Sequence, residues 1–212
     1  MHIHAPTQAL RFGTSLNKAR GLLIFIHGRG SCAEDIAGLA ETINAEDFAC
    51  IAPNATHSSW YPQRFLVPLE QNEPSLSSAL SLINILQMEG LNAGIPNERI
   101  ALIGFSQGAC LSLEFAYRNP TQLGFVAGLS GALIGPLNTP RIAVNLKKTP
   151  ILLGCAESDG HIPLEHVEQS AKLLEHMNAK VTKQIYPGGA HTVFGPEISW
   201  IKSQIVELRK VS

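Results

Sequence analysis

The chain has 212 residues, of which 45% are hydrophobic and 16% are charged, and its formal net charge at pH 7 is −1. A chain with so little net charge has no basic field to attract nucleic acid or an anionic membrane, so we expect neither as a partner. The length suits one domain, 1–212, that is large enough to bury a substantial core.

Other general features favour the cytoplasm. The N-terminus lacks the positive stretch and apolar run of a secretory signal, and the longest apolar runs, such as 22–26, are far too short to cross a bilayer. The four cysteines stand singly, without the spacing of a disulfide framework or a zinc site, which is typical of a reducing compartment. We therefore expect a cytoplasmic protein with no metal site and no membrane span.

Apolar runs alternate with helix-like segments along the chain. Most of the runs are apolar throughout, which is the pattern of parallel strands that are covered on both faces. The sequence therefore predicts an α/β fold, in which a mostly parallel central sheet carries helices on both faces and residues 3–20 form an antiparallel edge. The expected strands are 21–26, 48–52, 99–103, 124–130, 151–155 and the half-exposed 181–186, and the expected helices are 33–43, 75–89, 107–118, 163–177 and 194–210.

Two long connections interrupt this alternation. Residues 55–71 are polar but contain Trp60, Tyr61 and Phe65, and aromatic residues in a loop of this length favour an ordered, functional segment. Residues 131–149 are rich in glycine and proline and are a candidate for a short lid-like segment.

The pentapeptide Gly104-Phe105-Ser106-Gln107-Gly108 matches the pattern G-x-S-x-G between an expected strand and an expected helix. A strand that turns into a helix within about two residues forces the residue between them into a strained, nearly left-handed conformation. The flanking glycines remove the Cβ atoms that would clash in such a turn. The pattern in this context predicts a nucleophile elbow that exposes the Ser106 hydroxyl at the end of the sheet.

Ligands bind at the carboxyl ends of the strands in an open parallel sheet. Glu157 and Asp159 follow one expected strand, and His191 follows the next. A serine, an acid and a histidine in this chain order are typical of an α/β-hydrolase triad. We predict that Ser106 is the nucleophile, that His191 is its general base and that Asp159 orients the imidazole, with Glu157 as the alternative acid.

The tetrahedral intermediate of acyl transfer needs two hydrogen-bond donors for its oxyanion. One expected donor is the backbone N–H of Gln107, at the start of the helix, where the helix dipole also favours negative charge. The other is the backbone N–H of Arg29, between Gly28 and Gly30, which allow the chain to approach a ligand closely.

Two side chains near the predicted site have alternative roles. The Arg29 guanidinium is suited either to an anionic group of the substrate or to an ion pair with Glu34 or Asp35, and we favour the ion pair. His161 lies close to the acid in sequence and is the nearest rival of His191 as the base. It precedes the strand that should deliver the base, so His191 is preferred.

These motifs resemble the phospholipase/carboxylesterase family of small α/β-hydrolases, which includes the acyl-protein thioesterases. The matching segments are Ile26-His27-Gly28-Arg29-Gly30, Gly104-Phe105-Ser106-Gln107-Gly108-Ala109, Asp159-Gly160-His161-Ile162-Pro163 and Gly188-Gly189-Ala190-His191. The resemblance implies an α/β-hydrolase fold and places the acid at Asp159 rather than Glu157. Arg29, where the eukaryotic thioesterases typically carry leucine, and Ser59-Trp60-Tyr61-Pro62 are more similar to a bacterial branch.

The predicted function is that of a serine hydrolase without a cofactor, which cleaves small carboxylic esters through an acyl-enzyme, with thioesters as a second candidate class. Trp60, Tyr61, Phe65 and Phe194 are the candidates for an apolar acyl pocket, and a homodimer is a candidate assembly. The alternative is a protein of the same fold that binds a small molecule without turning it over. A broken triad would mark that alternative, and the sequence shows none.

Overall fold

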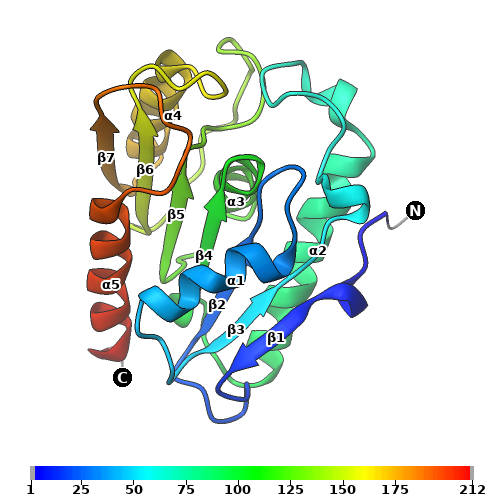
Figure 1. Cartoon of the computed structure of the whole chain (residues 1–212), viewed down its shortest axis with the longest axis vertical. Coiled ribbons are helices and arrows are strands. Elements are labelled where there is room, and N and C mark those ends of the chain that lie inside the picture. Colours follow the sequence, from blue (N-terminus) through cyan, green and yellow to red (C-terminus); the bar gives the residue numbers. More distant parts are fainter. Residues whose placement is uncertain (1–2, 211–212) are drawn as a thin grey trace.

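A seven-stranded sheet forms the centre of the computed structural model, which describes residues 3–210 (Figure 1). The strand order is β1-β3-β2-β4-β5-β6-β7. Every neighbouring pair is parallel except β1 and β3, which confirms the predicted antiparallel edge. The strands are β1 (Leu10–Gly13), β2 (Leu22–Ile26), β3 (Ala49–Ala52), β4 (Ile100–Phe105), β5 (Phe125–Leu129), β6 (Pro150–Ala156) and β7 (Lys180–Tyr186).

The apolar runs fill two cores, one on each face of the sheet. Successive side chains of a strand point to opposite faces, so Leu22 and Ile24 of β2 lie in one core while Leu23 and Phe25 lie in the other. All four side chains are fully buried. Burial on both faces explains why these strands are apolar without alternation.

Helices cover both faces, as the sequence predicts. The helices α2, α3 and α4 pack on one face, and α1 and α5 pack on the other (Figure 1). Their bounds are α1 (Ala33–Thr42), α2 (Ser75–Asn92), α3 (Gln107–Arg118), α4 (Leu164–His176) and α5 (Gly195–Lys210). Within residues 3–210, no helix is both long enough and apolar enough to cross a membrane.

The two long connections differ in structure. Residues 55–71 contain two short 3-10 helices, Thr56–Ser58 and Leu69–Asn72. Residues 131–149, the candidate for a lid, contain no helix or strand. Their start is held against α3 by the buried carboxylate of Glu114, which accepts hydrogen bonds from the Ile134 backbone at 3.2 Å and from Arg141 at 3.1 Å.

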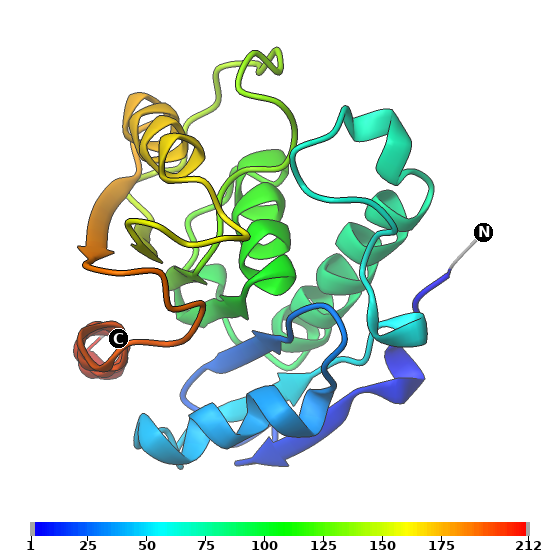
Figure 2. The ribbon, with the colours of Figure 1, turned by 45° about the horizontal axis from the view of Figure 1, so that its top comes forward.

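Parallel strands bring their carboxyl ends to one edge of the sheet. Figure 2 turns this edge toward the viewer, with the loops after β2, β6 and β7 gathered around the start of α3. The segments that carry the predicted chemistry therefore meet there, although they are far apart in the sequence.

Candidate active site

Ser106 stands alone between the last residue of β4 and the first residue of α3. Its backbone has φ 53° and ψ −116°, a positive φ that a side chain other than glycine rarely adopts. The turn is tight because β4 and α3 are in backbone contact: a Cβ atom at Gly104 would lie 2.2 Å from the Gly108 carbonyl oxygen. A Cβ atom at Gly108 would lie 2.0 Å from the Ile26 carbonyl oxygen of β2. The two glycines are thus required by close approach.

Gly108→Ala is expected to destabilise the protein by about 3 kcal/mol, because the new methyl group must push α3 away from β2. Gly38→Ala is the matched control, since a Cβ atom at this exposed position in α1 meets no atom within 4 Å. We expect the control to stabilise the protein by about 0.5–1 kcal/mol through helix propensity. Urea unfolding of the two variants measures both effects, and equal stabilities would contradict the close-packing argument.

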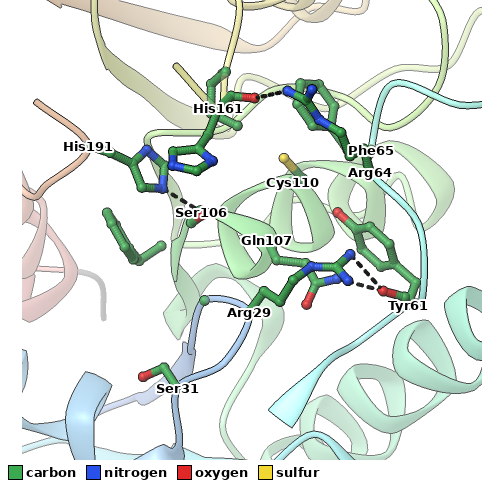
Figure 3. A pocket seen from close by; sticks show the side chains of 13 residues that line it. Arg29, Ser31, Tyr61, Arg64, Phe65, Ser106, Gln107, Cys110, His161 and His191 are labelled. Atoms are coloured by element: carbon green, nitrogen blue, oxygen red, sulfur yellow. Dashed lines mark hydrogen bonds between the residues drawn. The ribbon is translucent and has the colours of Figure 1, made fainter. Parts of the chain in front are cut away.

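Three side chains from different strand ends form one hydrogen-bonded chain. His191 Nε2 lies 2.8 Å from Ser106 Oγ, and His191 Nδ1 lies 2.7 Å from Asp159 Oδ2. Figure 3 shows the His191 ring directed at Ser106. The ring lies between those of Phe105 and His161, whose centroids are 5.0 Å and 4.7 Å from its own.

The Asp159 carboxylate is fully shielded from solvent and satisfied by protein donors. Its Oδ1 accepts the backbone N–H groups of His161 at 2.8 Å and Ile162 at 3.1 Å. Burial alone would raise the pKa of this carboxyl, but the hydrogen bonds from His191 and from the two backbone groups outweigh it and hold the pKa below its ordinary value. The ionised carboxylate accepts a hydrogen bond from the Nδ1–H of His191, which leaves Nε2 unprotonated and able to accept a hydrogen bond from the Ser106 hydroxyl.

The alternative acid, Glu157, lies elsewhere. Its side chain is exposed, and its Oε1 accepts the backbone N–H of Gly188 at 3.3 Å. The structure thus brings Asp159, and not Glu157, to His191. His161, the rival base, contributes its backbone to Asp159 while its ring packs against His191.

The loop that carries His191 is fixed on its C-terminal side by two contacts. Glu197, in the first turn of α5, accepts the backbone N–H of Phe194 at 2.7 Å. Ser130 donates its hydroxyl to the Thr192 carbonyl at 3.3 Å. Burial raises the pKa of the Glu197 carboxyl to about 7, so this group is readily protonated at neutral pH.

Two backbone donors at the site are without an acceptor. No hydrogen bond among residues 3–210 engages the N–H of Gln107 or that of Arg29. The loop around Arg29 is held by His27, whose Nε2 accepts the Ala55 N–H at 3.1 Å and whose Nδ1 lies 2.7 Å from the Gly28 carbonyl. Burial lowers the pKa of His27, and the neutral ring suits this pair of contacts.

The Arg29 side chain clamps the loop 55–71. Its guanidinium donates to the carbonyls of 61–63, at 2.8 Å for Pro62 and at 2.9 Å for Tyr61, the latter contact being visible in Figure 3. The expected ion pair with Glu34 or Asp35 is therefore wrong within the described part of the chain, because the loop carbonyls take the guanidinium instead. The Gln107 side chain also holds this loop, because its Nε2 donates to the Tyr61 carbonyl at 2.8 Å.

A cavity of about 370 Å³ opens beside Ser106. Of the four aromatic residues expected in an acyl pocket, Tyr61 and Phe65 line this cavity. Trp60 is fully buried behind it and donates its indole N–H to the His27 carbonyl at 2.8 Å. Phe194 stacks on Tyr186, with ring centroids 4.0 Å apart, and lies outside the cavity lining. Of the four candidates, Tyr61 and Phe65 therefore remain, and Phe105 adds a third aromatic ring to the lining.

Sequence reasoning gave no place in the pocket to several residues that line the cavity, among them Arg64 and Cys110. Nothing in the sequence around an isolated arginine in a polar loop, or around a cysteine in a helix, indicates that the side chain lines a cavity. Burial raises the pKa of the Cys110 thiol to about 12, so it remains protonated and is no competing nucleophile. Within residues 3–210, no group of three histidine, cysteine or acidic side chains is placed to hold a metal ion.

The sheet with its two helical layers and a serine at the strand-to-helix turn defines an enzyme with the α/β-hydrolase fold. The sequence profile of the phospholipase/carboxylesterase family matches residues 13–208, and the chain belongs to this family. The resemblance of the motifs to this family is thereby confirmed.

Relatives of this family are similar along most of the chain. A probable carboxylesterase of Oryza sativa is 27% identical over 208 residues, covering 88% of this chain and 78% of the relative. Acyl-protein thioesterase 1 of Kluyveromyces lactis is 28% identical over 213 residues, covering 88% of this chain and 91% of the relative. A phospholipase/carboxylesterase from Dyadobacter fermentans of known crystal structure is 37% identical with a TM-score of 0.90, covering 97% of this chain and 99% of its own. The chain is therefore a hydrolase of the carboxylesterase or thioesterase type.

Proposed function

We propose that this hydrolase cleaves small carboxylic esters through a covalent acyl-enzyme on Ser106, with His191 as general base and Asp159 as its orienting acid. Thioesters are the second candidate class. The proposal rests on one observation: a continuous hydrogen-bonded chain from Asp159 through His191 ends at a serine that faces a cavity. We further propose that residues 1–212 act as one domain, since the strands β1 to β7 form one continuous sheet. The cytoplasm is the compartment that we propose, on the ground that the four cysteines lack the spacing of a disulfide framework.

Acylation begins when Ser106 Oγ attacks the carbonyl carbon of the ester. A serine hydroxyl is a poor nucleophile at neutral pH, so His191 Nε2 accepts its proton as the C–O bond forms. The imidazolium that results is stabilised by the Asp159 carboxylate at Nδ1. His191 then returns the proton to the leaving alcohol, and the acyl group remains on Ser106.

The carbonyl oxygen becomes an oxyanion during this attack. The free N–H groups of Arg29 and Gln107 are the two donors that we assign to it. Gln107 begins α3, where the helix dipole adds a favourable field. Each such donor contributes about 10²- to 10³-fold to kcat in comparable hydrolases.

Deacylation repeats the same chemistry with water as the nucleophile. His191 accepts a proton from the water, which attacks the acyl carbon, and the proton then passes to Ser106 Oγ as the acid leaves. The two steps consume one ester and one water and release an alcohol and a carboxylic acid. They require no cofactor.

Covalent labelling tests the assignment of nucleophile and base. A fluorophosphonate probe is expected to modify the wild-type protein once, at Ser106, as read by intact-mass and peptide mass spectrometry. His191→Ala should slow labelling by at least about 10²-fold, because the hydroxyl loses its base.

His161→Ala is the matched control for labelling. Its ring touches His191 but has no hydrogen bond to Ser106, so labelling should proceed within a few-fold of the wild-type rate. Undiminished labelling of His191→Ala, or an equal loss in His161→Ala, would count against His191 as the base.

A further inference from the structure

The cavity beside Ser106 is lined by positively charged groups. Arg29 and Arg64 line it together with the rings of His161 and His191, and none of the lining residues is an Asp or a Glu. The nearest catalytic carboxylate, Asp159, has a side-chain exposure of 0% and is enclosed by its own donors. Any charge that the cavity presents to a ligand is therefore positive.

The guanidinium of Arg64 has N–H donors that no protein acceptor uses in the described structure. Its Nη2 donates to the His161 carbonyl at 3.1 Å, which joins the loop 55–71 to the acid segment across the cavity (Figure 3). A guanidinium carries five N–H donors, so most of those on Arg64 remain free. Among residues 3–210 it has no ion pair, whereas Arg11 pairs with Glu89 at 2.9 Å.

The charge of Arg29 adds to the same field. Its donors are satisfied by carbonyl oxygens, which leave its positive charge without a counterion in the described structure. Two such charges lie beside the apolar walls of Phe65 and Ile162 and attract an anion that enters the cavity. Both arginines are exposed, so added salt screens this attraction.

A second hollow lies on the other side of Gly28 and Phe105, and both residues also line the first cavity. Its lining combines apolar residues such as Ile36 and Leu39 with His27, Ser31 and one acid, Asp35, which accepts a hydrogen bond from Ser31 at 2.7 Å. The two hollows share Gly28, Ser31 and Phe105 but differ in charge, because the first has two arginines in its lining and the second has Asp35. A substrate with one anionic end is therefore better placed in the first.

We infer that the substrate is a small ester that carries a carboxylate, and that Arg64 binds this carboxylate as a specificity-determining residue. This inference rests on the proposed esterase function and narrows its substrate class. The planar guanidinium fork matches the two oxygens of a carboxylate, while the apolar walls hold the carbon chain. Tyr61 and Phe65 then contact the part of the substrate between the carboxylate and the scissile bond.

Matched ester pairs test the inference. Mono-p-nitrophenyl glutarate and p-nitrophenyl valerate differ by a carboxylate in the acyl part, and 4-acetoxybenzoate and phenyl acetate differ by one in the alcohol part. In at least one pair, the wild-type protein should show the higher kcat/KM for the anionic ester. Arg64→Gln should lower that preference by about 10- to 100-fold, mainly through KM, and Arg64→Lys should restore part of it. The preference should also weaken as salt is added.

Arg11→Gln, which removes an arginine at the far edge of the sheet, is the control and should leave the preference unchanged. If Arg64→Gln lowered kcat/KM equally for the anionic and the neutral ester of each pair, Arg64 would merely support the His161 segment. That result would overturn the inference. So would the absence of any anionic preference in the wild-type protein.

Binding separates the inference from the proposed function. If the wild-type protein hydrolyses none of the esters, the esterase proposal fails. NMR titration of Ser106→Ala with monomethyl glutarate and methyl valerate then measures the same preference without turnover. Tighter binding of the anionic ester that is lost in Arg64→Gln supports the inference, and equal binding of the two esters overturns it.

Discussion

Ser106→Ala is expected to lower kcat for p-nitrophenyl butyrate by about 10⁴- to 10⁶-fold, which leaves the activity that backbone donors and binding provide alone. The reason is chemical: alanine offers no atom that can form the acyl-enzyme, and His191 has no hydroxyl to activate. Rates of p-nitrophenol release measure the effect.

The matched control for this experiment is Ser203→Ala, which removes an exposed hydroxyl on α5. We expect wild-type activity from it, and far-UV circular dichroism should show both variants folded. Substantial turnover by folded Ser106→Ala would contradict the proposed nucleophile and would support a different catalytic group in the cavity.

Asp159→Asn is expected to lower kcat by about 10⁴-fold while the fold is preserved. An amide can present an N–H to His191 Nδ1, which favours the wrong tautomer and removes the charge that stabilises the imidazolium. Glu157→Gln makes the same chemical change in the neighbouring acid, which contacts Gly188 and not His191. It should retain activity within a few-fold.

The same ester assay distinguishes the two acids. A larger loss from Glu157→Gln than from Asp159→Asn would reverse the assignment of the acid. Equal losses would mean that both carboxylates act through the loop between β6 and α4 rather than through the imidazole.

The positions of the strand ends could be predicted because the apolar runs in the sequence mark the strands of a parallel sheet. An apolar run without alternation predicts a strand covered on both faces, and parallel strands must end at the same edge. Ser106 and Asp159 each follow such a run, and His191 follows the half-exposed strand that comes next in the chain, so their positions after parallel strands indicated that they meet. The nucleophile elbow could be predicted because the close approach of β4, α3 and β2 requires glycine at positions 104 and 108.

The side chains around the cavity could not be predicted in this way. The Arg29 guanidinium binds carbonyls more than thirty residues along the chain, and nothing in the neighbouring sequence marks them as acceptors. Trp60 and Phe194 are aromatic like Tyr61 and Phe65, but packing against His27 and Tyr186 directs them elsewhere. Arg64 reaches the site through the path of the loop 55–71, which has no periodic pattern to read.

The position of β7 links activity to the local stability of one edge of the sheet. Ser106 follows the central strand β4, whereas His191 follows β7, which pairs with β6 alone and is followed by an exposed turn. Edge elements open at a lower free energy than the core of a fold. We expect fraying of β7 to separate the base from the nucleophile while Ser106 keeps its place, so that inactivation precedes global unfolding.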